Sequence, residues 1–288
     1  MINISSKVRR ASAEDQNQIA SLGNYEANIH RHLDWRSPLD WIGSPNFWVL
    51  EEEGYVTAAL ACPEDPPQVA WIRLFGHHPH LTGAEAWSAL WRSASNEILF
   101  ASKKTQVAAI IVKQWFQELL LSSGFEARQN IVLLQLDQEN IRHLAEPPQI
   151  RIRPMLASDI PAVEKVDRES FGVFWHNTFD ALSRARLQAA SATVAEDDSG
   201  VVGYQLSTGN PLGAHLARLG VRPEAQGRGI GSALVSDLIQ QLGGRQMGRL
   251  SVNTQSDNTA SLALYKKLGF TQTGEYYPVM VYRASAND

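Results

Sequence analysis

The chain of 288 residues repeats itself once, and this repeat constrains its fold more than any other feature of the sequence. Residues 8–15 read VRRASAED and residues 152–159 read IRPMLASD, so a strand-like segment is followed each time by a helix start. The Gly-Phe pair at 124–125 recurs at 269–270, at nearly the same shift of 145 residues. A period of this length indicates a duplicated domain, because solenoid repeats are only about 20–50 residues long.

The joint between the two copies has the composition of a linker. Residues 143–149 read HLAEPPQ, and the two consecutive prolines prevent a helix there. The sequence therefore predicts two domains of ordinary size, residues 1–143 and residues 150–288. Each half ends in a strand-like run, over 131–136 and 277–282.

A glycine-rich turn between a strand and a helix predicts an anion site in the second half. Pro223 ends the strand before the turn, and Ile230 begins an apolar helical pattern. Such a turn exposes backbone N–H groups at the positive end of a helix dipole, where a pyrophosphate can bind. Its glycines would let the backbone approach the phosphates closely. The candidate binding residues are Leu219, Gly220, Val221, Gln226, Gly227, Arg228, Gly229, Ile230, Gly231 and Ser232.

The pattern Gln226-x-x-Gly229-x-Gly231 resembles the acetyl-CoA pyrophosphate loop of the GNAT N-acetyltransferase superfamily. A second string, Asn258-x-x-Ala-x-x-x-Tyr265-x-x-x-Gly-Phe, resembles the segment that follows this loop in that family. The resemblance implies that acetyl-CoA is the co-substrate, that Asn258 contacts its pantetheine arm, and that Tyr265 lies near its sulfur.

The resemblance also implies the fold class, α/β (α+β). We expect two GNAT-like domains, each a mixed, mostly antiparallel sheet flanked by helices. For the second half the sequence predicts strands near 150–154, 191–196, 201–207, 214–221 and 249–253, and helices near 158–170, 178–189, 229–242 and 258–268.

The first half lacks the residues that would bind acetyl-CoA. Aligning Pro79 with Pro223 places residues 82–87, which read TGAEAW, over the glycine-rich turn. Glu85 would then set a carboxylate where phosphates should lie. We therefore expect one cofactor site per chain and a degenerate first domain, which supports the fold, shapes the acceptor cleft or binds another ligand. The arrangement resembles that of mycothiol synthases, a likeness of architecture that does not extend to the substrate.

Two residues are candidates for proton transfer. The resemblance gives Tyr265 the role of protonating or hydrogen-bonding the departing thiolate. His215 lies at the start of the strand that leads into the turn, and an imidazole there could take the proton of an ammonium at neutral pH. An inert, hydrogen-bonded His215 is the alternative. A weaker resemblance places Phe174, Trp175 and His176 on the acceptor side.

Composition excludes several other classes of protein. The net charge is −4 with no basic block, which argues against nucleic-acid binding. No run approaches the roughly 20 apolar residues of a membrane span, and Cys62 is the single cysteine, so we expect a cytoplasmic protein without membrane partners. The histidines of residues 77–80 lack further ligands, and no metal is expected.

These observations together predict an acetyl-CoA-dependent N-acetyltransferase that modifies a primary amine, either a small molecule or a peptide N-terminus, by direct attack in a ternary complex. Two alternatives remain open from the sequence. A non-catalytic acetyl-CoA sensor would keep the turn but fill the acceptor cleft. A transferase of longer acyl groups would need a pocket beyond the thioester.

Overall fold

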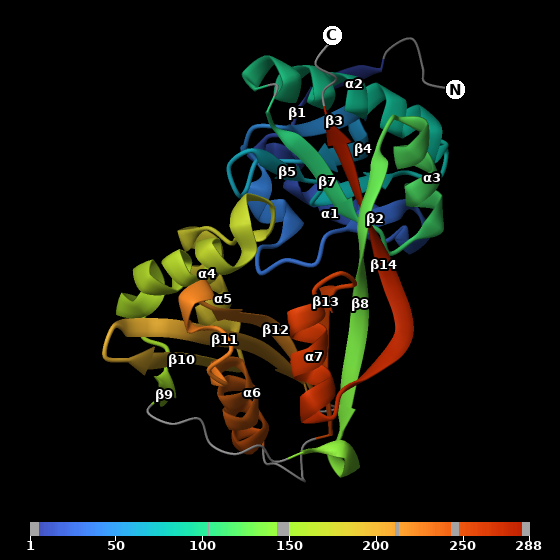
Figure 1. Cartoon of the computed structure of the whole chain (residues 1–288). Helices are drawn as coiled ribbons and strands as arrows, with labels where there is room; N and C mark the ends of the chain where they lie inside the picture. The colour runs from blue at the N-terminus through green and yellow to red at the C-terminus, as the bar shows by residue number, and fades with distance from the viewer. Residues whose placement is uncertain (1–5, 103, 143–149, 211–212, 243–247, 284–288) are drawn as a thin grey trace. The chain divides into compact units, whose positions relative to one another are not determined.

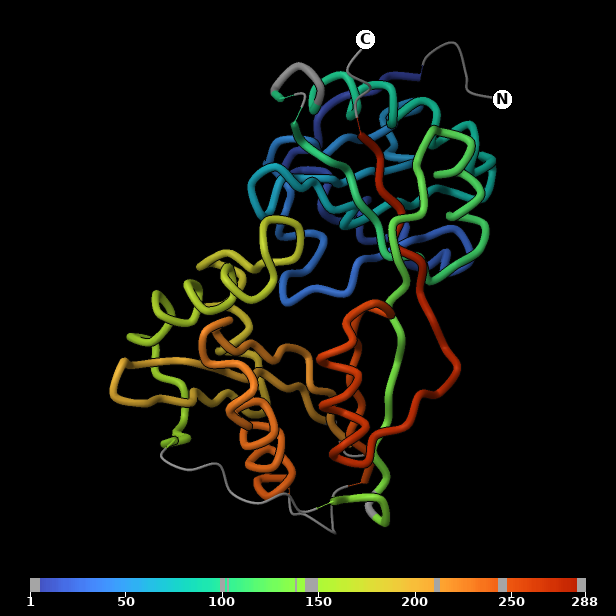
Figure 2. Tube along the Cα trace, viewed as in Figure 1, coloured from blue at the N-terminus to red at the C-terminus, as the bar shows by residue number. Residues whose placement is uncertain are grey.

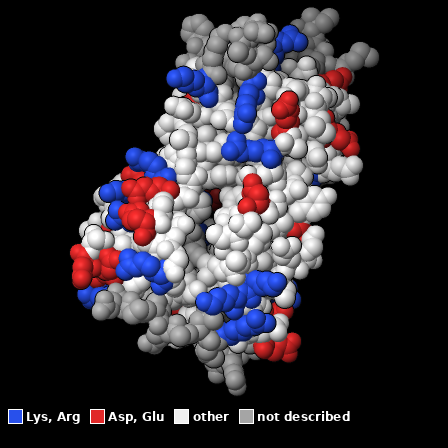
Figure 3. All heavy atoms as spheres, viewed as in Figure 1, with Lys and Arg blue, Asp and Glu red and all other residues white. Residues whose placement is uncertain are grey.

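The computed structural model describes residues 6–102, 104–142, 150–210, 213–242 and 248–283. The chain forms two compact units. The N-terminal unit comprises residues 1–128 and 278–288, and the C-terminal unit comprises residues 129–277. No helix in the described segments is long and apolar enough to cross a membrane. On the face drawn in Figure 3, basic and acidic side chains are interspersed.

The N-terminal unit is built on a five-stranded antiparallel sheet in the order β1-β3-β4-β6-β2. A further strand, β5, pairs in parallel with β7, and β7 pairs with the end of β14. The strands are β1 (Lys7–Arg10), β2 (Ile29–Arg31), β3 (Phe47–Glu52), β4 (Tyr55–Ala61), β5 (Val69–Trp71), β6 (Leu74–His77), β7 (Gln106–Ile110) and β14 (Thr271–Arg283). The helices are α1 (Gln16–Leu22), α2 (Gly83–Ala101) and α3 (Gln114–Ser122).

The C-terminal unit contains strands in the order β8-β13-β12-β11-β10-β9. Strands β12 and β13 are parallel, and the other neighbours in this order are antiparallel. The strands are β8 (Glu126–Asp137), β9 (Arg151–Pro154), β10 (Ser191–Asp197), β11 (Gly200–Asn210), β12 (Gly213–Val221) and β13 (Arg249–Gln255). The helices are α4 (Ile160–Trp175), α5 (Phe179–Gln188), α6 (Ile230–Gln241) and α7 (Thr259–Leu268). The predicted fold class is confirmed.

Helices cover both faces of this sheet (Figure 1). Gly203 and Tyr204 are neighbours on β11, and alternate residues of a strand point to opposite faces. The Tyr204 hydroxyl donates a hydrogen bond to Asp167 of α4, whereas a Cβ on Gly203 would lie 3.1 Å from Ile230 of α6. Helix α7 packs with α6, because Tyr265 shares an apolar cluster with Leu238. The face of α4 and the face of α6 and α7 are therefore distinct.

An ion-pair cluster recurs in both units. In the N-terminal unit the Arg9 guanidinium donates to Asp15 and to Glu51, at 2.7 and 2.6 Å. In the C-terminal unit the Arg153 guanidinium donates to Asp159 and to Glu196, at 2.7 and 2.9 Å. Each arginine lies on the first strand, the aspartate begins the first helix, and the glutamate lies on a neighbouring strand. This shared geometry supports the duplication that the sequence indicates.

The two units exchange their closing strands. Residues 131–137 of β8 pair with β13 of the C-terminal unit, although they precede the joint between the halves. Residues 279–283 of β14 pair with β7 of the N-terminal unit, although they end the second half. The trace of the chain thus passes from one unit to the other along both β8 and β14 (Figure 2).

Because of this exchange, the boundaries of the observed units differ from those of the expected domains. The expected domains were residues 1–143 and 150–288, whereas the C-terminal unit begins at residue 129 and ends at residue 277. The predicted linker at residues 143–149 lies outside the described residues. The sequence pattern identified the strands at 131–136 and 277–282 but not the sheets that they join.

The exchange predicts that truncating a core residue of β8 or β14 destabilises the unit whose core that residue joins. Leu136 of β8 is fully buried among residues of the C-terminal core, and Met280 of β14 is fully buried in the N-terminal core. Each substitution to alanine should cost about 2–5 kcal/mol of unfolding free energy. Leu136→Ala should speed hydrogen exchange in α6, and Met280→Ala should speed it in α2. The assignment of strands is wrong if each variant affects the other unit instead.

Candidate active site

Strand β12 pairs with its neighbour β13 over only part of its length. Its pairing with β13 runs from Gly213 to Leu216 and stops there, while its pairing with β11 continues to Val221. A β-bulge at Ala217 marks the change, because Leu206 pairs with Arg218 and Ser207 pairs with Leu216. Beyond Leu216, no described strand pairs with the edge of β12 that faces away from β11. Apart from the carbonyl of Val221, which accepts from Ser170 at 2.9 Å, backbone groups along this edge are available to an extended ligand.

The glycine-rich turn follows directly and ends at the N-terminus of α6. Gly227 and Gly229 have φ angles of 78° and 82°, in the left-handed region that favours glycine. Gly229 is the N-cap residue of α6, no side chain caps the helix, and its first turn contains no acidic residue. The first backbone N–H groups of the helix, including those of Ile230, Gly231 and Ser232, can therefore bind an anion.

Side chains of the turn hold it against the strand. The Gln226 amide donates to the carbonyl of Val221 at 3.0 Å, and Arg228 forms an ion pair with Asp197 at 2.9 Å. A Cβ on Gly231 would lie 3.2 Å from Leu264 of α7, so only a very small residue allows this close approach. The structure thus brings the predicted turn, its strand and the second motif together.

The second motif places Tyr265 where β12 and β13 diverge. Tyr265 lies in the same apolar cluster as Leu216 and Val252, the last pair between the two strands. Its burial raises the pKa of the phenol, so the hydroxyl keeps its proton at neutral pH. It is therefore available to donate a proton at this point.

Asn258 fixes the start of α7. Its side-chain oxygen accepts a hydrogen bond from the Ser261 amide at 3.1 Å, and its side-chain nitrogen donates to Gln255 at 3.4 Å. Gly269, with a φ of 103°, ends the helix as the sequence predicts. Asn258 thus lies between the end of β13 and the helix that carries Tyr265.

His215 lies on the opposite face of the sheet from Tyr265. It precedes Leu216, whose side chain belongs to the cluster under α6 and α7, so its own side chain points to the face of α4. Its Nδ1 lies 2.9 Å from the Ser251 hydroxyl, which in turn lies 3.4 Å from the carbonyl of Ala214. We assign the serine proton to that carbonyl, which leaves the His215 Nδ1–H as donor and Nε2 as acceptor. Burial lowers the pKa of His215, so the imidazole is neutral at neutral pH.

The segment predicted to face the acceptor ends α4. Gly172, with a φ of 66°, interrupts the helix just before Phe174 and Trp175. Phe174 is buried and contacts Trp175 edge-on, with the ring centroids 5.1 Å apart. The Nδ1 atom of His176 lies 3.0 Å from the carbonyl of Val173, at the end of the same segment. This segment lies on the face of α4, as does His215.

A buried charge network, absent from the sequence-based site, joins this segment to β12. The Asp167 carboxylate accepts hydrogen bonds from Arg218 at 2.8 and 2.9 Å, from the Asn177 amide at 2.5 Å and from the Tyr204 hydroxyl. Arg218 also donates to the carbonyl of Trp175 at 2.6 Å. Burial opposes the charge of Arg218, but Asp167 outweighs this and raises the pKa of the guanidinium. The network holds the end of α4 beside the β-bulge.

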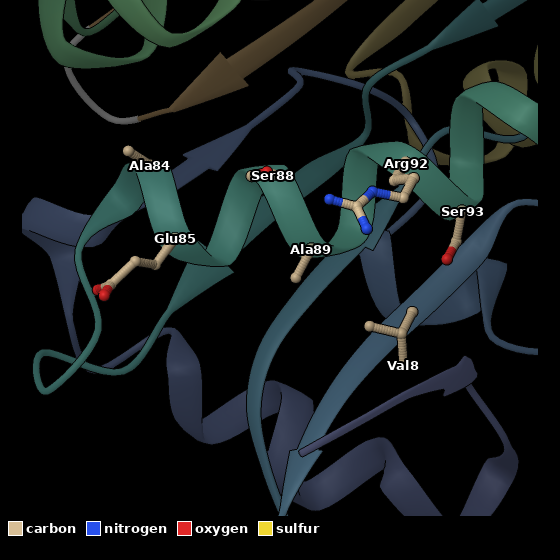
Figure 4. Close-up of a pocket in the computed structure, with 7 residues that line it drawn as sticks. All are labelled: Val8, Ala84, Glu85, Ser88, Ala89, Arg92 and Ser93. Carbon is tan, nitrogen blue, oxygen red and sulfur yellow. The ribbon is translucent and has the colours of Figure 1, made fainter. Parts of the chain in front are cut away.

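Other polar groups belong to the N-terminal unit. A surface hollow of about 610 Å³ in the N-terminal unit is lined by one side of α2 and by Val8 of β1 (Figure 4). Its charged residues are Glu85 and Arg92. His80 lies 2.6 Å from His78 and 2.7 Å from Glu52. Within the described segments, no group of three or more potential ligands is placed to hold a metal ion.

The buried network predicts an asymmetric cost of substitution. Arg218→Met leaves the fully buried Asp167 charge without its partner and should lower the free energy of unfolding by about 3–5 kcal/mol. The double variant Asp167→Leu/Arg218→Met removes both charges and should recover most of this loss. Arg184→Met, at an exposed ion pair of α5, serves as the control and should cost less than about 1 kcal/mol in urea denaturation. Equal losses in all three variants would contradict this account.

Comparison with known proteins agrees with this geometry. Residues 160–270 match the model of the acetyltransferase (GNAT) family. A GCN5-related N-acetyltransferase from Sphaerobacter thermophilus superposes with a TM-score of 0.64 at 18% identity, over 98% of this chain and 97% of that chain. A tandem GNAT protein from the clavulanic acid biosynthesis pathway superposes with a TM-score of 0.63 at 16% identity, over 98% of this chain and all of that chain.

Relatives are also found by sequence. A mycothiol acetyltransferase from Amycolatopsis mediterranei is 27% identical over 181 residues, which cover 54% of this chain and 58% of the relative. One from Pseudarthrobacter chlorophenolicus is 31% identical over 152 residues, 47% of this chain and 46% of the relative. The chain thus spans about half the length of these curated relatives. Residues 160–270, which contain both motifs and the diverging strands, are thus similar to the acetyltransferase (GNAT) family.

Proposed function

We propose that the protein is an acetyl-CoA-dependent N-acetyltransferase that transfers an acetyl group to a primary amine. The observation that carries this proposal is the unpaired edge of β12 beside the uncapped N-terminus of α6. One ligand that combines a pyrophosphate with an extended, amide-bearing arm would satisfy both features at once. Acetyl-CoA has this chemistry.

The residues of the C-terminal unit fit such a ligand. The N–H groups of residues 229–232 would hold the pyrophosphate, and the open edge of Leu219 to Val221 would pair with the pantetheine amides as a neighbouring strand does. Asn258 has a side-chain nitrogen directed to Gln255 at the same opening. When bound, acetyl-CoA would supply an acetyl thioester, and the arm's position would bring it to the point where β12 and β13 diverge.

The two proton transfers would take place on opposite faces of the sheet. His215 Nε2, on the face of α4, would take one proton from the attacking ammonium. The amine nitrogen then forms a bond with the acetyl carbon as the carbon–sulfur bond breaks. Tyr265, on the face of α7, would give its proton to the departing sulfur, and the second proton that the nitrogen loses as the amide forms would restore the phenol through solvent. A backbone N–H on the open edge of β12, such as that of Val221, would stabilise the charge on the acetyl oxygen.

The acceptor amine is best identified by a screen. Thiol release from acetyl-CoA is measured against amino sugars, amino acids, peptide N-termini and a mycothiol-type amine, the last because of the relatives' names. The proposal requires at least one amine to raise thiol release and to appear as the acetylated product. Tight acetyl-CoA binding without any transfer would favour a non-catalytic acetyl-CoA sensor. Faster transfer of a longer acyl group would favour a transferase of longer acyl groups.

Gly229 tests the pyrophosphate site. Gly229→Val should weaken acetyl-CoA binding at least about 100-fold in calorimetry, because a side chain would occupy the anion position and strain the left-handed backbone. Gly274→Val is the matched control, since Gly274 has a similar φ of 88° and open space around it on β14. An unchanged dissociation constant in the Gly229 variant would remove the pyrophosphate from this turn.

The proposed proton transfers predict how replacing Tyr265 or His215 changes turnover. Tyr265→Phe and His215→Gln should each lower kcat by about 10²–10⁴-fold while the dissociation constant of acetyl-CoA stays nearly constant. Because burial lowers the pKa of His215, kcat/KM should rise with pH below about 6.5 and stay flat through neutrality. This rise should disappear in His215→Gln. Wild-type turnover in either variant would exclude that residue from proton transfer.

A further inference from the structure

The N-terminal unit contains the same separation of strands as the proposed cofactor site. Its strand β5 pairs with β7 from Val69 to Trp71, and the strand then continues as β6 beside β4. The break at residues 72–73 corresponds, at a shift of 144, to residues 216–217 of β12, where its bulge lies. Beyond the break, the edge of β6 that faces away from β4 would be open if no other segment paired with it.

Strand β2 occupies that edge. Ile29 pairs with Gly76, His30 with Phe75 and Arg31 with Leu74, and the sheet ends at β2. The pairing extends one step further, because the amide of His32 donates to the carbonyl of Arg73 at 3.1 Å. In the C-terminal unit the matching edge, that of residues 219–221, has no described strand partner.

Two of the three side chains of β2 are buried in the N-terminal unit. Ile29 is 2% exposed, and its side chain would lie 3.1 Å from a Cβ on Gly76, the counterpart of Gly220 at the shift of 144. His30 is 2% exposed and stacks on Phe116 of α3, with the ring centroids 4.2 Å apart. An arm that entered this slot would have to displace both buried residues.

Two further contacts lie where the cofactor's other contacts would be. Lys113 stands at the position of Asn258 and forms an ion pair with Glu26, just before β2, at 2.8 Å. At the N-terminus of α2, the Thr82 hydroxyl accepts from the Glu85 amide at 3.2 Å and donates to the Glu85 carboxylate at 2.8 Å. The backbone amide of Thr82 also donates to this carboxylate, at 3.1 Å, and together with the hydroxyl it lowers the pKa of Glu85 to about 2, so a negative charge stays where a pyrophosphate would bind.

We propose that β2 is a built-in substitute for the pantetheine arm: the N-terminal unit keeps the strand slot of an acyl-CoA site and fills it with its own residues 29–31. Without β2, the slot could bind an extended, amide-bearing ligand that hydrogen-bonds to the edge of β6. With β2 in place, such a ligand cannot bind there. The inference rests on the proposed cofactor site of the C-terminal unit, which provides the open counterpart.

Hydrogen exchange of the full-length protein, with and without CoA, tests this inference. The amides of residues 74–77 should be protected in the absence of CoA and should not change when CoA is added. The amides of Leu219 and Val221, on the open edge, should exchange readily and gain about 100-fold protection at CoA concentrations of 100 times the dissociation constant, whereas the amide of Gly220 faces β11. Calorimetry should give one CoA per chain. Two sites per chain, or protection of residues 74–77 that depends on CoA, would overturn the proposal.

Two variants keep the test independent of overall stability. Lys113→Ala removes the ion pair at the start of β2 and should speed exchange at residues 74–77 at least about threefold, with Lys104→Ala as the control. Ile29→Ala should speed exchange at residues 74–77 about 30-fold or more. Ile19→Ala truncates an equally buried residue of α1 and should not speed exchange at residues 74–77 more than elsewhere in the unit. CoA affinity should stay within about twofold in all four. Unaltered β6 exchange in both β2 variants would overturn the proposal.

The same experiment separates this inference from the proposed function. If CoA binds nowhere and residues 219–221 remain unprotected, the proposed function fails. Protection of residues 74–77 without any ligand would still show that β2 occupies the slot of the N-terminal unit.

Discussion

The bulge at Ala217 is the constraint on which the proposed chemistry depends. A sheet strand normally satisfies its backbone groups on both edges, and an interior strand with an open edge is uncommon. Here the bulge ends the pairing with β13 while the pairing with β11 continues. Beyond Leu216 the two strands no longer pair, and we infer that groups on both faces of the sheet can approach this point. His215 and Tyr265 lie on these opposite faces.

The buried Asp167–Arg218 pair shows how the two sides of this opening are held together. Arg218 immediately follows the bulged residue, and its guanidinium reaches both Asp167 and the carbonyl of Trp175. An ion pair that is buried this completely contributes little net stability, because its desolvation offsets its attraction. Its value is geometric, since it fixes the end of α4 relative to the strand that would hold the thioester.

Local patterns predicted much of the C-terminal unit. Capping by Asn258, termination at Gly269 and the glycine-rich turn are short-range features, and the structure has the elements close to where they were expected. The strand exchange, the Asp167–Arg218 contact and the role of β2 were not predictable in this way. Residues 167 and 218 are far apart in sequence, and the partner of an apolar strand depends on which sheet it completes. A local pattern identifies a strand without identifying its neighbour.

The exchange of closing strands also determines when each half can fold. A domain at the N-terminus usually completes its fold during synthesis, before the rest of the chain emerges. The N-terminal unit lacks residues 279–283 until the C-terminal unit has been synthesised, and until then β7 has one open edge. By contrast, β8 is synthesised early and must wait for β13. The unit whose first strands are made earlier is therefore completed only by a strand that follows the whole of the other unit.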